Sequence, residues 1–266
     1  MFGKKKHPHP LEQEIQKLAQ FGFQKMGDFR AEDVFILGYP KSGNTLLQHV
    51  VAHLVFGLRK DASKSLINSC VTEFYNNPWF FRHNPQHFFK SHELPHPNFK
   101  KVIYIVRDGR EAVRSYYYML KNMNQKVSLE NLYTSGGETF VGTWANHLET
   151  WLENPYNAQI LWVRYEDLIQ DKKQTLKAIC QFLALERTED ELESVMEATS
   201  LANMKAMEQD FSWQRSKSHK TWKEDAQFVR EGNTKGFESD TQMNQAWVSA
   251  FEGKSKAMLQ KFMYLP

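Results

Sequence analysis

A lysine and two hydroxyl residues stand close together near residue 40, among residues that favour turns. The stretch reads Gly38-Tyr39-Pro40-Lys41-Ser42-Gly43-Asn44-Thr45. Lys41 carries a full positive charge, and the hydroxyls of Ser42 and Thr45 can donate hydrogen bonds. An ammonium, hydroxyls and backbone N–H groups in one glycine-containing turn are the groups that hold phosphate-like anions. The residue types and their spacing therefore predict an anion-binding loop.

Arg107 and Ser115 form a second candidate anion-binding pair. Arg107 closes the apolar run Val102–Val106, and Ser115 lies in the helix expected to follow over residues 110–121. The guanidinium fork of arginine matches the geometry of phosphate. The carboxyl end of a strand is also where open α/β folds bind ligands.

His92 is a candidate general base, because its unperturbed pKa of about 6.5 lies near working pH. It follows Lys90 and Ser91 at the end of a predicted short strand, and Glu93 beside it is a second candidate base. His92 is one of four histidines, at positions 83, 87, 92 and 96, that could suggest a metal site. Prolines at 85, 95 and 97 rule out a helix that would place these histidines on one face. We therefore expect no metal site.

The elements that position these groups can be predicted from apolar patterning. Val34–Leu37 and Val102–Val106 are continuous apolar runs, which suit strands buried on both faces of a parallel sheet. Asn44–Phe56 has apolar residues at helical spacing. A strand, a loop and a helix in this order direct free N–H groups and the positive end of the helix dipole at the loop.

The same patterning predicts the rest of the chain. It places strands at 87–92 and 160–163, helices at 11–21, 139–153, 172–184, 188–198, 201–208 and 241–264, and irregular chain at 128–137 and 209–240. Strands that alternate with helices predict an α/β fold, with a central parallel sheet flanked by helices on both faces. We expect residues 1–10 to be a flexible basic tail and residues 11–266 to be a single domain.

An aromatic-rich segment precedes His92. Phe74, Trp79 and Phe80 are candidates to line an acceptor pocket, since small-molecule pockets are mostly apolar and aromatic. The alternative is that these rings are core residues beneath a long loop. The sequence alone leaves both interpretations open.

Composition limits the class of protein. The 266 residues are 41% hydrophobic with a net charge of +3, which is ordinary for a globular protein and too small to predict a nucleic-acid partner. Cys70 and Cys180 form no disulfide framework and fit a reducing compartment. No apolar run is long enough for a membrane span, and the N-terminus lacks the pattern of a signal peptide. We expect a cytoplasmic protein.

The two anion motifs resemble those of sulfotransferases that use 3′-phosphoadenosine 5′-phosphosulfate (PAPS). The family's 5′-phosphosulfate loop usually reads Tyr-Pro-Lys-Ser-Gly-Thr-Thr-Trp, whereas the ATPase loop G-x-x-x-x-G-K-[ST] has its lysine after the second glycine. The segment 101–117 is similar to the family's 3′-phosphate motif. The resemblance implies that the 5′ end is held by Lys41, Ser42, Gly43, Asn44 and Thr45, and the 3′-phosphate by Arg107 and Ser115.

Weaker motifs complete the resemblance. Lys90-Ser91-His92 resembles Lys-Thr-His-Leu-Pro, whose histidine is the catalytic base, although Glu93 is inserted before Leu94. The further implied cofactor-binding residues are Tyr165, Thr199, Leu201 and Leu46 near the adenine and Arg230, Glu231 and Gly232 near the 3′-phosphate. Leu46 and Leu201 replace the Trp and Phe that normally contact the adenine, and Glu231 replaces a Lys. The family's C-terminal dimer motif is not visible, so no oligomeric state is predicted.

The resemblance implies a PAPS-dependent enzyme that sulfates a hydroxyl or amine of a small molecule and releases 3′,5′-ADP. In that scheme His92 takes the acceptor's proton, Lys41 stabilises the leaving phosphate, and Lys90 assists, with no metal required. A non-catalytic nucleotide-binding protein is the alternative favoured by Leu46, Leu201 and Glu231. A small-molecule kinase would need the Walker lysine that this chain lacks.

Overall fold

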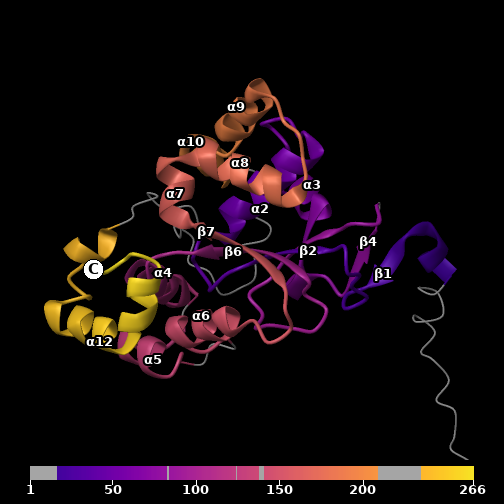
Figure 1. Cartoon of the computed structure of the whole chain (residues 1–266). Helices are drawn as coiled ribbons and strands as arrows, with labels where there is room; N and C mark the ends of the chain where they lie inside the picture. The colour runs from indigo at the N-terminus through magenta and orange to yellow at the C-terminus, as the bar shows by residue number, and fades with distance from the viewer. Residues whose placement is uncertain (1–16, 83, 124, 138–140, 209–234) are drawn as a thin grey trace, which may run out of the picture.

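A five-stranded parallel sheet forms the centre of the computed structural model, which describes residues 17–82, 84–123, 125–137, 141–208 and 235–266 (Figure 1). The strands lie in the order β3 (Val71–Glu73), β5 (Phe88–Lys90), β2 (Val34–Leu37), β6 (Lys101–Val106) and β7 (Gln159–Arg164). The predicted anion-binding loop follows β2, which pairs with both β5 and β6. This loop therefore lies at the middle of the carboxyl edge of the sheet.

Side chains alternate between the two faces of the sheet. Val34 and Ile36 join one apolar cluster, and Phe35 and Leu37 join the other. The first face is covered by α2 (Asn44–Phe56), α3 (Lys64–Cys70), α7 (Tyr165–Gln170), α8 (Lys172–Leu183) and α9 (Glu189–Ala198), and α10 (Leu201–Glu208) follows (Figure 1). The second face is covered by α4 (Gly109–Asn122), α5 (Leu129–Thr134), α6 (Trp144–Glu153) and α12 (Gln245–Lys261). The α/β fold predicted from the sequence is confirmed.

Smaller elements surround this sheet. A two-stranded antiparallel sheet pairs β1 (Phe23–Lys25) with β4 (Trp79–Phe81). Short 3₁₀ turns occupy η1 (Ala19–Phe21), η2 (Phe74–Asn76) and η3 (Gly236–Ser239). Within the described ranges, no helix is both long enough and apolar enough to cross a membrane.

Several boundaries differ from the sequence-based prediction. The loop predicted over 128–137 is wrong in part, because Ser128 caps α5 by accepting from the Asn131 N–H and Leu132 anchors that helix in the core. The helix predicted from 139 begins at Trp144, where the Thr143 side chain caps it. The last helix, predicted over 241–264, spans Gln245–Lys261. The basic tail, most of the 11–21 segment and residues 209–234 lie outside the described residues.

Candidate active site

The loop after β2 is shaped by two residues with left-handed backbone. Lys41 has φ 68° and Gly43 has φ 106°. A Cβ atom at Gly43 would lie 2.6 Å from Cδ2 of Tyr165, so glycine is needed where the loop packs on that ring. Ser42 is buried, and its Oγ has no hydrogen-bond partner within the described part of the chain. A buried hydroxyl without a partner at the start of a helix fits an anionic ligand that accepts its hydrogen bond.

Asn44 and His92 tie the loop to the residues that follow β5. Asn44 Nδ2 donates to the carbonyl oxygen of Gly38 at 3.2 Å and to that of Ser91 at 3.3 Å. His92 Nδ1 lies 2.8 Å from the same Gly38 oxygen. His92 Nδ1 also lies 3.1 Å from Asn44 Nδ2, which can only donate, so the two contacts need opposite tautomers. In the tautomer that donates to Gly38, the shorter contact, Nδ1 carries the proton and Nε2 keeps its lone pair. The candidate base is thereby fixed against the predicted anion-binding loop.

The environment of His92 favours its neutral form. Burial, and then the positive charge of Lys90, lower the pKa of His92 from 6.5 to about 4. The imidazole is therefore unprotonated at neutral pH. A neutral ring with a free Nε2 is the form that can accept a proton from an acceptor hydroxyl.

Three buried residues hold the backbone beside His92. His147 Nε2 donates to the His92 carbonyl oxygen at 3.0 Å, and His147 Nδ1 accepts from the Tyr104 hydroxyl at 2.6 Å. Trp151 Nε1 donates to the carbonyl oxygen of Glu93 at 3.1 Å. Two of these residues lie on α6 and one on β6, so the second layer of helices positions the candidate base.

Lys90 reaches the predicted anion-binding loop from β5, which pairs with β2. Its Nζ lies 3.2 Å from Oγ1 of Thr45 and 2.9 Å from Oε1 of Glu73. Glu73 was not identified from the sequence, because β3 is only three residues long and its apolar pattern is too short to read.

Tyr75, which belongs to the aromatic-rich segment noted in the sequence, lies beside His92. Its hydroxyl accepts the His92 N–H at 3.2 Å, and the two rings are near-parallel with centroids 6.1 Å apart. Phe74 packs edge-on against Tyr75. Tyr75 is 40% exposed, so a ring beside the candidate base is open to contact with an acceptor.

The other two predicted pocket residues lie elsewhere. Trp79 stacks on Phe23 between the strands of the small sheet. Phe80 is buried in the core, where it packs edge-on against Phe89 with the Arg82 guanidinium over its ring. For Phe80, the geometry matches the core interpretation that the sequence left open.

The second anion motif meets the first through Arg107. Its Nη1 donates to the Lys41 carbonyl oxygen at 3.2 Å, and its guanidinium carbon lies 4.4 Å from the centre of the Tyr165 ring. Ser115, the predicted partner of Arg107, is buried one turn beyond Glu111 on α4. The structure therefore brings the two predicted anion sites to adjoining positions at the carboxyl edge of the sheet.

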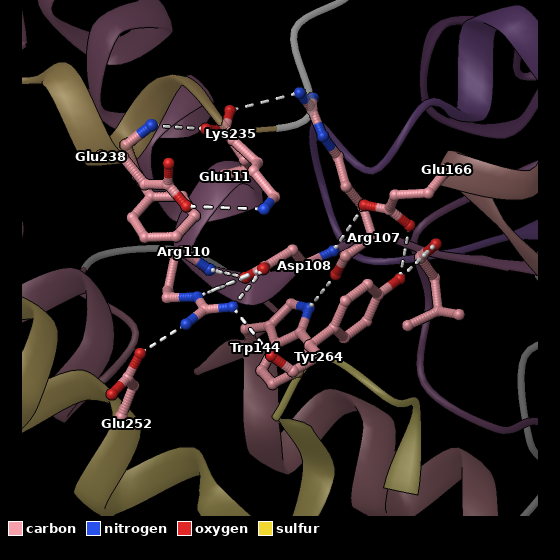
Figure 2. Close-up of polar contacts among 12 residues, drawn as sticks. Arg107, Asp108, Arg110, Glu111, Trp144, Glu166, Lys235, Glu238, Glu252 and Tyr264 are labelled. Atoms are coloured by element: carbon pink, nitrogen blue, oxygen red, sulfur yellow. Dashed lines mark hydrogen bonds and ion pairs between the residues drawn. The ribbon is translucent and has the colours of Figure 1, made fainter. Parts of the chain in front are cut away.

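Glu111 is a further buried group in this region (Figure 2). Its Oε2 lies 3.3 Å from Nη2 of Arg107, and its Oε1 accepts the Phe237 N–H at 2.6 Å. Burial raises the pKa of the Glu111 carboxyl, against the opposing effect of Arg107. One carboxylate thus links the predicted 3′-phosphate arginine to the η3 turn.

A second set of polar contacts supports the backbone on either side of Arg107. Trp144 Nε1 donates to the Arg107 carbonyl oxygen at 3.2 Å, and Glu166 Oε1 accepts the Asp108 N–H at 3.2 Å (Figure 2). Asp108 caps α4 and pairs with Arg110 at 2.6 Å. The arginine therefore projects from a backbone that is fixed by side chains of α6 and α7.

The predicted adenine residues lie in different environments. Thr199 is buried, with its Oγ1 donating to the Val195 carbonyl at 2.7 Å and its own carbonyl accepting from Lys172 at 2.7 Å. Leu46 is partly buried against the cluster under α2, whereas Leu201 is exposed. The last predicted residues, Arg230, Glu231 and Gly232, lie outside the described residues. Within the described ranges, no group of three or more His, Cys, Asp or Glu residues is arranged to hold a metal ion.

Comparison with known proteins identifies the family. Residues 31–262 match the sulfotransferase domain family. The chain belongs to the sulfotransferase family. Its relatives include the 3-alpha-hydroxysteroid sulfotransferase of Cavia porcellus, 28% identical over 200 residues that cover 66% of this chain and 67% of that protein. Sulfotransferase 2A1 of Homo sapiens is 30% identical over 198 residues, with 66% and 67% covered.

Solved structures share the fold of this sulfotransferase. Retinol dehydratase in a complex with retinol and PAP aligns with a TM-score of 0.70 at 15% identity, covering 94% of this chain and 95% of that one. Mouse sulfotransferase SULT7A1 complexed with PAP aligns with a TM-score of 0.60 at 20% identity, covering 95% and 94%. The family, fold and enzyme class predicted from the sequence are confirmed, while the roles of individual site residues stay predictions.

Proposed function

We propose that this sulfotransferase transfers the sulfuryl group of PAPS to a hydroxyl or amine of a small molecule and releases 3′,5′-ADP. The 2.8 Å contact between His92 Nδ1 and the Gly38 carbonyl supports this most directly, because it joins the candidate base to the predicted phosphate loop. Relatives named for hydroxysteroid and amine acceptors, and a neighbour that binds retinol, support a small-molecule acceptor.

The residues divide the chemistry between them. PAPS supplies an activated sulfuryl group and a 5′-phosphate that can leave. His92 Nε2 accepts the proton of the acceptor hydroxyl, whose oxygen forms the new bond to sulfur while the bond from sulfur to the 5′-phosphate oxygen breaks. Lys41 and the N–H groups of the first turn of α2 stabilise the negative charge that the leaving phosphate takes up.

Specificity for the nucleotide comes from the second anion site. Arg107 and Ser115 bind the 3′-phosphate, and the position of Arg107 is set by its contact with the Lys41 carbonyl. Arg107 and Lys41 each provide one positively charged contact to the nucleotide. A ligand without the 3′-phosphate forfeits one of them.

Isothermal calorimetry with 3′,5′-ADP and 5′-AMP tests this assignment. We expect 3′,5′-ADP to bind much more tightly, and Arg107→Ala to remove most of that difference, since charge-assisted contacts contribute about 1.5–3 kcal/mol each. The exposed Arg59, which pairs with Asp61, provides the matched control Arg59→Ala. Equal affinities of the wild-type protein for the two nucleotides would contradict the cofactor assignment.

Catalysis is tested separately with PAPS and a panel of alcohols, phenols and amines, followed by mass spectrometry. Sulfated product together with 3′,5′-ADP is the expected result. Tight binding of 3′,5′-ADP without any turnover across a broad panel would favour the non-catalytic alternative. Transfer of phosphate from ATP in the same panel would favour the kinase alternative.

A further inference from the structure

Lys90 is held between two side chains from neighbouring elements. Its Nζ lies 2.9 Å from Oε1 of Glu73 and 3.2 Å from Oγ1 of Thr45. The Lys90 side chain is 8% exposed and that of Glu73 is 23% exposed, so the ion pair is largely shielded from water. A shielded pair is screened by salt much less than a surface pair.

The sheet register fixes this arrangement. Glu73 and Lys90 are register partners at the carboxyl ends of the parallel strands β3 and β5. Partners in register project from the same face of a sheet, so the carboxylate stands beside the ammonium by virtue of the backbone. Thr45 lies in the first turn of α2, which follows the adjacent strand β2.

The charges of this cluster also reach the candidate base. The positive charge of Lys90 lowers the pKa of His92, and the negative charge of Glu73 acts in the opposite direction. The charge of Glu73 therefore acts on the candidate base, and its Oε1 contacts Lys90 directly.

We propose that Glu73 is a positioning residue that holds the Lys90 ammonium at the first turn of α2, where the 5′-phosphate of the nucleotide binds. The inference rests on the proposed function and deepens it. Lysine carries its charge on a flexible four-carbon arm, so an ammonium without a fixed partner spends less time at one position. Glu73 acts through Lys90 and does not touch the nucleotide.

A double-mutant cycle read by calorimetry tests this role with two probes, 3′,5′-ADP and adenosine 3′-phosphate. The second probe lacks the 5′-phosphate. The dissociation constant of adenosine 3′-phosphate divided by that of 3′,5′-ADP therefore isolates the contacts made by that phosphate. We expect Glu73→Gln to lower this ratio about tenfold, which corresponds to about 1.4 kcal/mol. Lys90→Met should lower it at least as much, and the double variant should match Lys90→Met alone.

Controls separate positioning from general damage to the fold. Glu73→Asp keeps the charge on a shorter arm and should retain most of the ratio, and thermal melts of all variants identify any that unfold. The matched control is Glu197→Gln, which breaks the exposed 2.8 Å pair with Lys60 and should leave the ratio unchanged.

Three results would overturn the inference. An unchanged or raised ratio in Glu73→Gln would mean that the carboxylate does not hold Lys90 in a productive position. If Glu73→Gln lowered the ratio as much in the Lys90→Met background as in the wild-type protein, Glu73 would act independently of Lys90. A wild-type protein that binds both probes equally would overturn the inference together with the proposed function, whereas the first two results leave that function intact.

Discussion

The hydroxyl of Tyr264, two residues before the last residue of the sequence shown, donates to Oε2 of Glu166 at 2.7 Å (Figure 2). The other oxygen of Glu166 accepts the backbone N–H of Asp108, next to Arg107. A residue near the end of the chain thus supports the segment that carries the predicted 3′-phosphate arginine. Burial raises the pKa of Glu166, so the carboxylate depends on these donors to stay charged.

Removing the Tyr264 hydroxyl should destabilise the protein. Tyr264→Phe leaves an oxygen of a buried carboxylate without its donor, which costs about 1–3 kcal/mol of unfolding free energy. Urea denaturation followed by circular dichroism measures the loss. Tyr156→Phe, at an exposed tyrosine, is the matched control and should be close to neutral. Equal stability of the two variants would contradict the role of the Tyr264–Glu166 bond.

The buried His147 predicts a loss of stability in mild acid. Burial lowers the pKa of His147 from 6.5 to about 4 in the folded protein. The unfolded chain therefore binds the proton more tightly, so stability is present above pH 6.5 and is lost as the pH falls toward 4. Linkage gives a loss on the order of 2 kcal/mol at pH 5 from this residue.

The measurement is the unfolding free energy at pH 7 and at pH 5. In His147→Gln, the difference in unfolding free energy between pH 7 and pH 5 should shrink by about 2 kcal/mol. The variant should be less stable than the wild-type protein at both pH values. The exposed His96 provides the control His96→Gln, which should keep the wild-type difference in unfolding free energy between pH 7 and pH 5. An unchanged pH dependence in His147→Gln would show that another group titrates in this range.

His92 and Glu93 can be separated as candidate bases. His92→Ala should reduce turnover of PAPS about 10²–10⁴-fold, as expected for loss of a general base, while 3′,5′-ADP affinity changes little. Glu93→Gln serves as the matched variant and should retain activity. The opposite pattern, with Glu93→Gln inactive and His92→Ala active, would assign the base to the carboxylate.

Lys41 allows a test of charge without a change of backbone shape. Because Lys41 has φ 68°, Lys41→Gly keeps a conformation that glycine adopts freely. We expect unchanged or slightly higher thermal stability together with a loss of turnover of about 10²–10³-fold, typical of removing one stabiliser of a developing anion. Retained turnover in a folded Lys41→Gly variant would remove Lys41 from the proposed mechanism.

Leu46 tests how the adenine is held. Leu46→Trp restores the family's aromatic residue, and a base–aromatic stack contributes about 1–3 kcal/mol. We expect tighter binding of 3′,5′-ADP by calorimetry, with a thermal melt to detect overpacking. Leu66→Trp, at an exposed leucine of α3, is the control. Unchanged affinity with an unchanged melting temperature would mean that residue 46 does not face the adenine.

The parts of the site that could be predicted from sequence are encoded locally. The loop with Lys41 and the strand end with Arg107 each combine an apolar run, a turn and a helix within one short segment, and β2, α2 and β6 appear where the patterning places them. Glu73 and His147 could not be predicted in the same way. The pairing of β3 with β5 and the packing of α6 place them at the candidate site, because both bring together residues that are far apart in the chain.

The sheet's strand order also has a consequence for the way the chain folds during synthesis. β2, β3, β5 and β6 all lie before residue 107, so most of the sheet leaves the ribosome early. Phe35, Leu37 and Tyr104 project into the cluster that α12 completes, and α12 is made from residues 245–261. A nascent chain therefore presents an apolar sheet face long before its cover exists, which exposes unfinished chains to aggregation and to chaperones.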